Sequence, residues 1–233
     1  MASGQQPVLD IWQAVPQTGL DEFRIQPITL QLLPGEFALV ETNDPQRAAW
    51  FADLCCGFVR LVEGTVSFVG RDWTTMTPDY AAALRGRIGR VFGNVGWIDF
   101  LDVATNVLLP QLHHTRRDAR ELREEAARLA GSFGLPGLPT GHPRDLSAKD
   151  LARAACIRAF LGEPALLLLE SPLQARFADL AVPLLDALTA ARQQGAAAIW
   201  LTSSDYLWRD RSAPITHRLR LRDYGLFPVR RAA

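Results

Sequence analysis

The sequence is nearly free of lysine. Lys149 is the only lysine among its 233 residues, and arginine supplies all the other cations of the Lys and Arg class. The common phosphate-binding loop G-x-x-x-x-G-K-[ST] uses its lysine to reach the β- and γ-phosphates of a nucleotide. Lys149 lies in LSAKDLA, with no such glycine frame before it. The sequence therefore contains no intact loop of this kind.

Cysteine, net charge and long apolar runs are also scarce. Three cysteines, two of them adjacent, form no disulfide framework and favour a reducing cytosol. The four histidines show no ligand spacing, so we expect no metal site. A net charge of zero gives no reason to expect nucleic acid as a partner. The longest apolar runs, such as PALLLLESPL, fall short of the roughly 20 residues of a membrane span, and MASGQQPVLD lacks the build of a signal peptide.

What the sequence does contain is an alternation of strand and helix patterns. Strands are predicted by PVLDIWQAV, FRIQPITLQLLPGE, FALV, GTVSFVGRDW, IGRVFGNVG, ALLLLE, AAAIWLTS and the closing hairpin HRLRLRDYGLF. Helices are predicted at about 46–56, from DVATNVLLPQLHH through RRDARELREEAARLAGSFGL, in SAKDLARAACIRAFLG and in FADLAVPLLDALTAARQQG. This alternation favours an α/β fold with a largely parallel sheet covered on both faces.

One loop in this frame is unusual. LVETNDPQRAAW follows an apolar strand and precedes a helix, which is the setting of a phosphate-binding loop. It has no glycine, no lysine and no hydroxyl at the places where a nucleotide needs them.

Seven segments along the chain stand in a familiar order. They are LLPGEFALV, EGTVSFVGRDW, RIGRVFGN, DVATNVLLPQL, DLSAKDLARAACIRAFLGEPALLLLESPL, IWLTSSD and HRLRLRDYGLF. In this order and at these intervals they resemble the ATP-binding subunit of ABC transporters over nearly the whole chain. The resemblance implies the P-loop NTPase-like ABC ATPase fold, with a mostly parallel sheet core, N-terminal antiparallel strands and an inserted α-helical subdomain. We expect one domain, 1–233, with its core at 1–94 and 151–233 and the helical subdomain at about 95–150.

The phosphate loop of that family is altered here. Its glycines fall at Glu41 and Asp44, its lysine at Arg47, and its Ser-Thr pair at Ala48 and Ala49. Two carboxylates then lie near a helix N-terminus where a triphosphate would sit, and they repel it. Alanine offers Mg²⁺ no hydroxyl, and the bulky fork of an arginine replaces lysine poorly in a tight loop. We therefore expect this loop to hold neither ATP nor Mg²⁺.

The positions that the family uses for hydrolysis are altered as well. The Q-loop glutamine aligns with Gly93, and the metal-binding aspartate of the Walker B strand aligns with Glu170. The general base aligns with Ser171 and the switch histidine with Ser203, and a serine hydroxyl accepts no proton from water near neutral pH without a base of its own. No catalytic residue is intact by this comparison. An aromatic for adenine is expected near Gln17, where none is obvious. Trp12 and Phe23 are the nearby aromatics, but the core is the favoured place for each.

Two other motifs resemble family surfaces that need no ATP chemistry of their own. LSAKD resembles the signature motif, which in the family faces the ATP of a partner subunit. Ser147 suits a helix N-cap and has the unpaired N–H groups of the helix behind it, and Lys149 offers a cation. An ordinary capped helix with a solvated lysine fits the same residues. Arg153 and Arg158, further along this helix, suggest structural ion pairs.

The second such surface is NVGWIDFLDV, which resembles the groove where a permease inserts its coupling helix. Trp97, Ile98, Phe100 and Leu101 place large apolar side chains in a loop, and such side chains mark a contact surface when exposed. The alternative is that they pack the base of the helical subdomain.

Three functions compete on this basis. The leading one is a pseudo-ATPase subunit of an ABC transporter, peripheral on the cytoplasmic face of the inner (plasma) membrane. It would pair with an active ATPase subunit as a heterodimer, dock on the permease, and share an ATP/Mg²⁺ site supplied by that partner. One alternative is an unorthodox but active ABC ATPase, and Glu170 and Arg47 are the residues that support it. The other is a soluble interaction protein on the same fold.

Overall fold

A computed structural model describes residues 5–17, 26–93, 96–173, 175–204, 206–209, 213–223 and 225–229. Its strands form two sheets. The four-stranded sheet has the order β2-β1-β4-β5 and pairs antiparallel throughout. Its strands are β1 (Leu9–Pro16), β2 (Ile28–Leu32), β4 (Leu61–Phe68) and β5 (Arg71–Asp72).

The six-stranded sheet has the order β10-β9-β3-β8-β7-β6. Its strands are β3 (Phe37–Glu41), β6 (Ile88–Val91), β7 (Leu166–Glu170), β8 (Ala197–Thr202), β9 (His217–Arg222) and β10 (Gly225–Pro228). All neighbours in it pair parallel except β10, which returns antiparallel along β9. The carboxyl ends of β3, β7 and β8 therefore meet at one edge of the sheet, which is where this class of sheet places its ligands.

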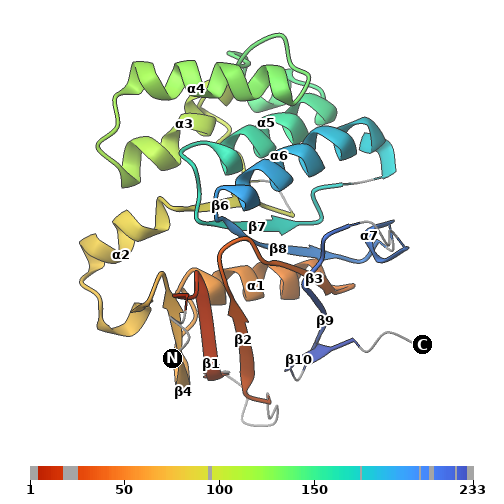
Figure 1. The fold of residues 1–233 in the computed structure, drawn as a ribbon. Coiled ribbons are helices and arrows are strands. Elements are labelled where there is room, and N and C mark those ends of the chain that lie inside the picture. Colours follow the sequence, from red (N-terminus) through yellow and green to blue (C-terminus); the bar gives the residue numbers. More distant parts are fainter. Residues whose placement is uncertain are drawn as a thin grey trace.

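Helices cover both faces of this sheet (Figure 1). They are α1 (Pro45–Cys55), α2 (Pro78–Arg85), α3 (Val103–His114), α4 (Ala119–Ser132), α5 (Ala148–Phe160), α6 (Ala181–Gln193) and α7 (Tyr206–Arg209), with short 3-10 turns at Trp73–Thr75, Pro143–Asp145 and Ala175–Leu180. Figure 1 shows α1 between the two sheets, and α3 to α6 stacked on the opposite side of the parallel sheet. None of the described helices is both long and apolar enough to cross a lipid bilayer.

The alternation of side chains along the central strands divides the interior into two cores. Ala38 and Val40 of β3 face α1 and the antiparallel sheet, whereas Phe37 and Leu39 face the helices on the other side. Successive side chains of a strand point to opposite faces, so a strand that is apolar throughout is buried on both. All five residues of β7 are buried in this way. The LLLL run is therefore a central strand, as the sequence predicts.

The observed helices and strands agree in type and order with those predicted from the sequence, with three differences. The long helical stretch is two helices, because residues 115–118 leave the helix between α3 and α4. Helix α2 was not predicted, and the helix from FADLAVPLL begins with a 3-10 turn. The prediction that Trp12 lies in the core is wrong, because its side chain on β1 is 60% exposed. Phe23 lies outside the described residues.

Candidate functional site

The loop after β3 is held by the protein's own groups. Asp44 is the N-cap of α1, and its Oδ1 accepts hydrogen bonds from the backbone N–H groups of Gln46 (2.8 Å) and Arg47 (3.3 Å). Pro45, at the first helical position, has no N–H to offer. The N–H of Ala48 already bonds the carbonyl of Asp44 at 3.0 Å. The amides at this helix N-terminus are thus bonded to a carboxylate or a carbonyl of the protein, or are absent.

The backbone of this loop also differs from a phosphate cradle in conformation. Residues 41–48 are all described, and none of them has a positive φ. Glycine-rich anion-binding loops need that conformation to turn successive N–H groups inward. Glu41 and Asp44 therefore lie in a backbone that differs from that of a glycine-rich anion-binding loop.

The charged side chains of the loop are paired with strand β9 and the turn after it. Glu41 accepts hydrogen bonds at 3.0 and 2.7 Å from Nε and Nη2 of Arg220, and Arg222 lies 3.6 Å away. Arg47 forms ion pairs with Asp44, at 3.3 Å, and with Asp223. Arg47 therefore points its charge at two carboxylates of the protein itself.

Glu170 is almost completely buried. Its side chain is 3% exposed and accepts a hydrogen bond of 2.6 Å from Nε of Arg90, which comes from β6. The other carboxylate oxygen accepts the N–H of Gly93 at 3.3 Å. Glu170 and Gly93 are therefore in contact, and the cation beside the carboxylate is the guanidinium of Arg90.

Arg90 connects three further groups around Glu170. Its Nη1 donates to Asp53 on α1 at 2.6 Å, and its Nη2 donates to the carbonyl of Ala49 at 3.2 Å. The guanidinium also lies over the ring of Phe92, 4.5 Å from its centroid. Burial acts to lower the pKa of Arg90, but the hydrogen bonds to Asp53 and Glu170 outweigh it and raise that pKa above its ordinary value. The guanidinium stays charged and neutralises Glu170.

Ser171 and Ser203 lie just past the carboxyl ends of β7 and β8. The backbone N–H of Ser171 donates to the carbonyl of Leu201 at 2.8 Å, and the residue has φ of 45°, in the left-handed region. Both side chains are exposed. The sheet therefore brings Glu41, Glu170, Ser171 and Ser203 to one edge, where the two serine side chains are exposed.

The predicted partner-facing motif begins α5. Ser147 is the N-cap: its Oγ accepts the N–H of Asp150 at 3.1 Å and donates to the Asp150 carboxylate at 2.8 Å. Lys149 forms an ion pair, because its Nζ lies 2.8 Å from Oδ2 of Asp179. Arg153 forms the expected ion pair, with the same carboxylate at 2.6 Å. The hydrogen bond from Lys149, followed by Arg153, holds the pKa of Asp179 below its ordinary value.

The segment 97–101 is folded tightly by one buried amide. Nδ2 of Asn106 donates to the carbonyls of Ile98 (3.0 Å) and Leu101 (3.2 Å), and its Oδ1 accepts the N–H of Ile98 at 2.8 Å. Phe100 is 81% exposed, while Trp97, Ile98 and Leu101 are half-buried. Asn94 and Val95, at the start of this stretch, lie outside the described residues.

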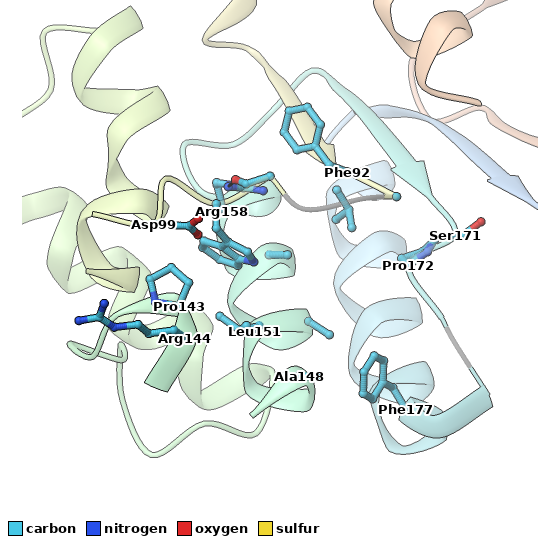
Figure 2. A pocket seen from close by; sticks show the side chains of 16 residues that line it. Phe92, Asp99, Pro143, Arg144, Ala148, Leu151, Arg158, Ser171, Pro172 and Phe177 are labelled. Atoms are coloured by element: carbon cyan, nitrogen blue, oxygen red, sulfur yellow. Dashed lines mark hydrogen bonds between the residues drawn. The ribbon is translucent and has the colours of Figure 1, made fainter. Parts of the chain in front are cut away.

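A cavity of about 580 Å³ opens beside this segment (Figure 2). Figure 2 shows its wall built from Phe92 after β6, Leu151 and Arg158 of α5, and Pro172 after β7. The guanidinium of Arg158 lies 4.6 Å from the ring centroid of Trp97 and bonds the carbonyl of Gly96. No described carboxylate forms an ion pair with Arg158, so the structural ion pair expected for it is wrong, and burial lowers its pKa to about 10.

Several residues of this site were missed from the sequence. Arg90 and Asp53 are the partners of Glu170, and Asp223 and Arg220 are the partners of the loop. One signal was present: Arg90 stands in the apolar strand RIGRVF, and an arginine in a buried strand needs a counter-charge. The other partners are far apart in sequence and carry no local signal.

Curated proteins with similar sequences are ATP-binding proteins of transport and cell division. The macrolide export ATP-binding/permease protein MacB of Rhodopirellula baltica is 31% identical over 62% of this chain and 22% of its own length. The spermidine/putrescine import ATP-binding protein PotA of Frankia alni is 31% identical over 64% of this chain and 30% of its own. The cell division ATP-binding protein FtsE of Escherichia coli is 26% identical over 64% and 66%. The match thus spans less than a third of the first two relatives. No protein-family model matches the chain.

Solved structures define the fold more completely. The dimeric structure of a bacterial ABC transporter cassette superposes with a TM-score of 0.79 at 18% identity, covering 96% of this chain and 100% of that one. An ATP binding subunit of an ABC transporter gives 0.79 at 16% identity, covering 94% and 88%. The chain therefore has the fold of an ABC ATPase cassette. The curated relatives support the same family, the ATP-binding cassettes of ABC transporters.

Proposed function

We propose that this chain is a non-hydrolysing cassette of a membrane ABC transporter, which pairs with an active ATPase subunit and docks on the permease. The observation that carries the proposal is the contact between Arg90 and Glu170, at 2.6 Å. Magnesium needs free, hard oxygen ligands and most of its coordination shell. The carboxylate that remains at the metal position is already neutralised and buried.

The phosphate side of the site supports the same conclusion. Asp44 occupies the helix N-terminus, and Glu41 lies at the end of β3. A triphosphate would have to displace Asp44 from two amides and accept a nearby negative charge in its place. Arg47 is engaged by Asp44 and Asp223 and offers little compensation. The positions of these charged side chains therefore oppose both the binding and the hydrolysis of ATP.

A subunit of this kind acts through its neighbours. Ser147 and Lys149 are exposed at the start of α5 and would face ATP held by the partner ATPase, with Asp150 and Asp179 setting their positions. Phe100 and its neighbours in the segment 97–101 would meet the permease, because Asn106 holds them in a fixed loop with Phe100 projecting. The complex would sit on the cytoplasmic face of the membrane.

The direct test is calorimetric titration of the purified chain with Mg²⁺-ATP. We expect no heat of binding and no thermal shift at millimolar nucleotide. Micromolar binding would overturn the proposal in favour of an unorthodox active ATPase.

The second test is purification from native membranes. We expect an intact ATPase subunit and a permease to come with the chain. Recovery of the chain alone, or only with soluble proteins, would favour an interaction protein on the same fold. In the intact complex, Ser147→Arg should lower ATP turnover several-fold, since a bulky cation replaces the cap, whereas Ser132→Arg, at the exposed end of α4, should leave it unchanged.

A further inference from the structure

The cavity of Figure 2 lies between one face of α5 and the residues that follow β6 and β7. Its volume of about 580 Å³ is within the usual range of small-molecule sites. The wall from α5 consists of residues at helical spacing, namely Ala148, Leu151, Ala152, Ala155 and Arg158. None of residues 41–49, in and around the loop after β3, lines the cavity. It is therefore separate from the altered phosphate loop.

Three alanines keep the cavity open on the side of α5. Ala148, Ala152 and Ala155 each place a single methyl group on this wall, where a longer side chain would fill the space. Across from them, Pro172 is buried and Phe177 is 6% exposed and packed in the helical core. The described walls are therefore largely apolar, and packing holds them in place.

One end of the cavity carries two aromatic rings and a cation. The guanidinium of Arg158 lies 4.6 Å from the ring centroid of Trp97 and 5.3 Å from that of Phe92. Its Nη1 also bonds the carbonyl of Gly96. Stacking on rings and a carbonyl bond fix a guanidinium in position but leave its charge uncompensated.

The charge of Arg158 has no partner among the described carboxylates. Burial lowers the pKa of Arg158 to about 10, which keeps the guanidinium charged at neutral pH. Its Nε is buried without a hydrogen-bond partner. Asp99 also lines the cavity, but it is exposed and forms no ion pair with Arg158. A preorganised cation in an apolar setting favours an anionic ligand.

From these observations we propose that the cavity binds a small molecule with one carboxylate on a flat apolar body, such as an aromatic acid. The carboxylate pairs with Arg158, and the apolar body lies between the alanines of α5 and the side chains of Pro172 and Phe177. The bound molecule contacts α5 and the ends of β6 and β7 together, so it stabilises their relative position. This inference goes beyond the proposed function and does not depend on it.

The first experiment compares three naphthyl compounds of matched size on the purified wild-type chain. Calorimetric titration measures the binding of naphthylacetate, of the neutral naphthylethanol and of the cationic naphthylethylamine. We expect naphthylacetate to bind with a Kd of about 100 µM or below, and the alcohol to bind about tenfold more weakly, because only the carboxylate gains a charge-assisted hydrogen bond. The amine should not bind. An alcohol or amine that binds as well as the acid would overturn the inference, as would an acid that does not bind.

The second experiment locates the bound acid with a matched pair of alanine variants. Ala152→Phe fills the cavity and should weaken binding of naphthylacetate about tenfold or more. Ala127→Phe is the control, because Ala127 is exposed on α4 and does not line the cavity. Equal affinities of the two variants would mean that the acid binds elsewhere, and would contradict the inference.

The third experiment assigns the charge with two arginines that both line the cavity. Arg158→Met keeps the apolar stem, so we expect the acid and the alcohol to bind it with affinities within about twofold of each other. Arg144→Met should keep the preference of the wild type for the acid, since Arg144 is exposed. The opposite pattern would overturn the role of Arg158. Thermal melting checks that each variant folds; if Arg158→Met does not, the first two experiments still decide.

The outcomes are independent of the tests of the proposed function. Failure of the acid to bind leaves the titration with Mg²⁺-ATP and the purification from membranes unaffected. Micromolar binding of Mg²⁺-ATP would overturn the proposed function and leave the acid site in place.

Discussion

Arg90 shows how a single side chain changes the character of a site. It joins β6 to Glu170 on β7, to Asp53 on α1 and to the carbonyl of Ala49. The family resemblance indicates that Glu170 is a retained carboxylate, which read alone favours metal binding. The arginine beside it reverses that interpretation, because a buried carboxylate with a guanidinium partner is already satisfied.

Removal of Arg90 should therefore destabilise the fold. Arg90→Leu leaves Glu170 buried without a counter-charge, and we expect a loss of about 3–5 kcal/mol in the free energy of unfolding. Urea denaturation at pH 7 measures this change in the free energy of unfolding. The exposed Arg87→Leu serves as the control and should change stability by less than about 0.5 kcal/mol.

The double variant Arg90→Leu with Glu170→Leu extends this test. It should recover most of the loss, because no charge remains buried. A single Arg90→Leu that cost less than about 1 kcal/mol would show that the pair is not the centre of the site.

At the scale of elements, helix caps explain much of the local structure. Asp44, Asp102, Asp118 and Ser147 cap α1, α3, α4 and α5 through their side chains. In α1 the cap occupies the place where a nucleotide-binding helix meets its anion. The same local rule that caps the other three helices thus places a carboxylate of the protein at the N-terminus of α1.

Asp102 should make stability depend on pH. The N–H of Thr105 donates to its carboxylate at 2.6 Å and holds the pKa of Asp102 below its ordinary value of 3.8. A carboxyl with a lowered folded pKa stabilises above the unfolded pKa, and this contribution is lost as the pH falls through the folded pKa. Asp102→Asn should therefore give a flatter stability profile than the wild type below about pH 5.

The control for this prediction is Asp102→Ala. It removes the cap entirely and should lower stability by about 1 kcal/mol at pH 7, where Asn still caps. Urea midpoints at a series of pH values measure both variants. Parallel profiles of the wild type and Asp102→Asn would contradict the role of the carboxylate.

Most elements could be predicted because their signals are local. The apolar run of β7 and the charged and apolar faces of α4 determine their own conformation and burial. Helix α2 was missed although TPDYAAALR carries a signal, a proline at the first turn after a threonine. The partners of Glu41 and Arg47 could not be predicted, because 179 and 176 residues separate them from Arg220 and Asp223. The sequence therefore shows which residues lie in the loop after β3, but not which distant residues pair with them.

At the scale of the whole molecule, the cysteines report on the two cores. Cys55 and Cys56 lie in the core that contains α1, and Cys156 lies in the helical core. Burial raises the pKa of Cys56 and Cys156 to about 12 and that of Cys55 well above its ordinary value. Since the thiolate is the reactive form, none of the three should alkylate in the folded protein at pH 8.

Alkylation across a urea series should then show how the cores unfold. We expect the thiols of both cores to become reactive at one urea midpoint, because the same parallel strands contribute to each. Mass spectrometry of iodoacetamide-treated peptides measures the three sites separately, with the fully denatured chain as the reference. Distinct midpoints would argue against a single domain of 1–233.

The Arg90–Glu170 pair has an energetic consequence for any transporter built on this chain. In the proposed transporter, the Arg90 guanidinium would take the place of a metal ion at Glu170, so this half would not respond to the ratio of ATP to ADP in the cell. Only the opposite half would respond to that ratio. Each closing of the pair would then spend at most one ATP, and the stoichiometry of fuel to cargo would be half that of a symmetric machine.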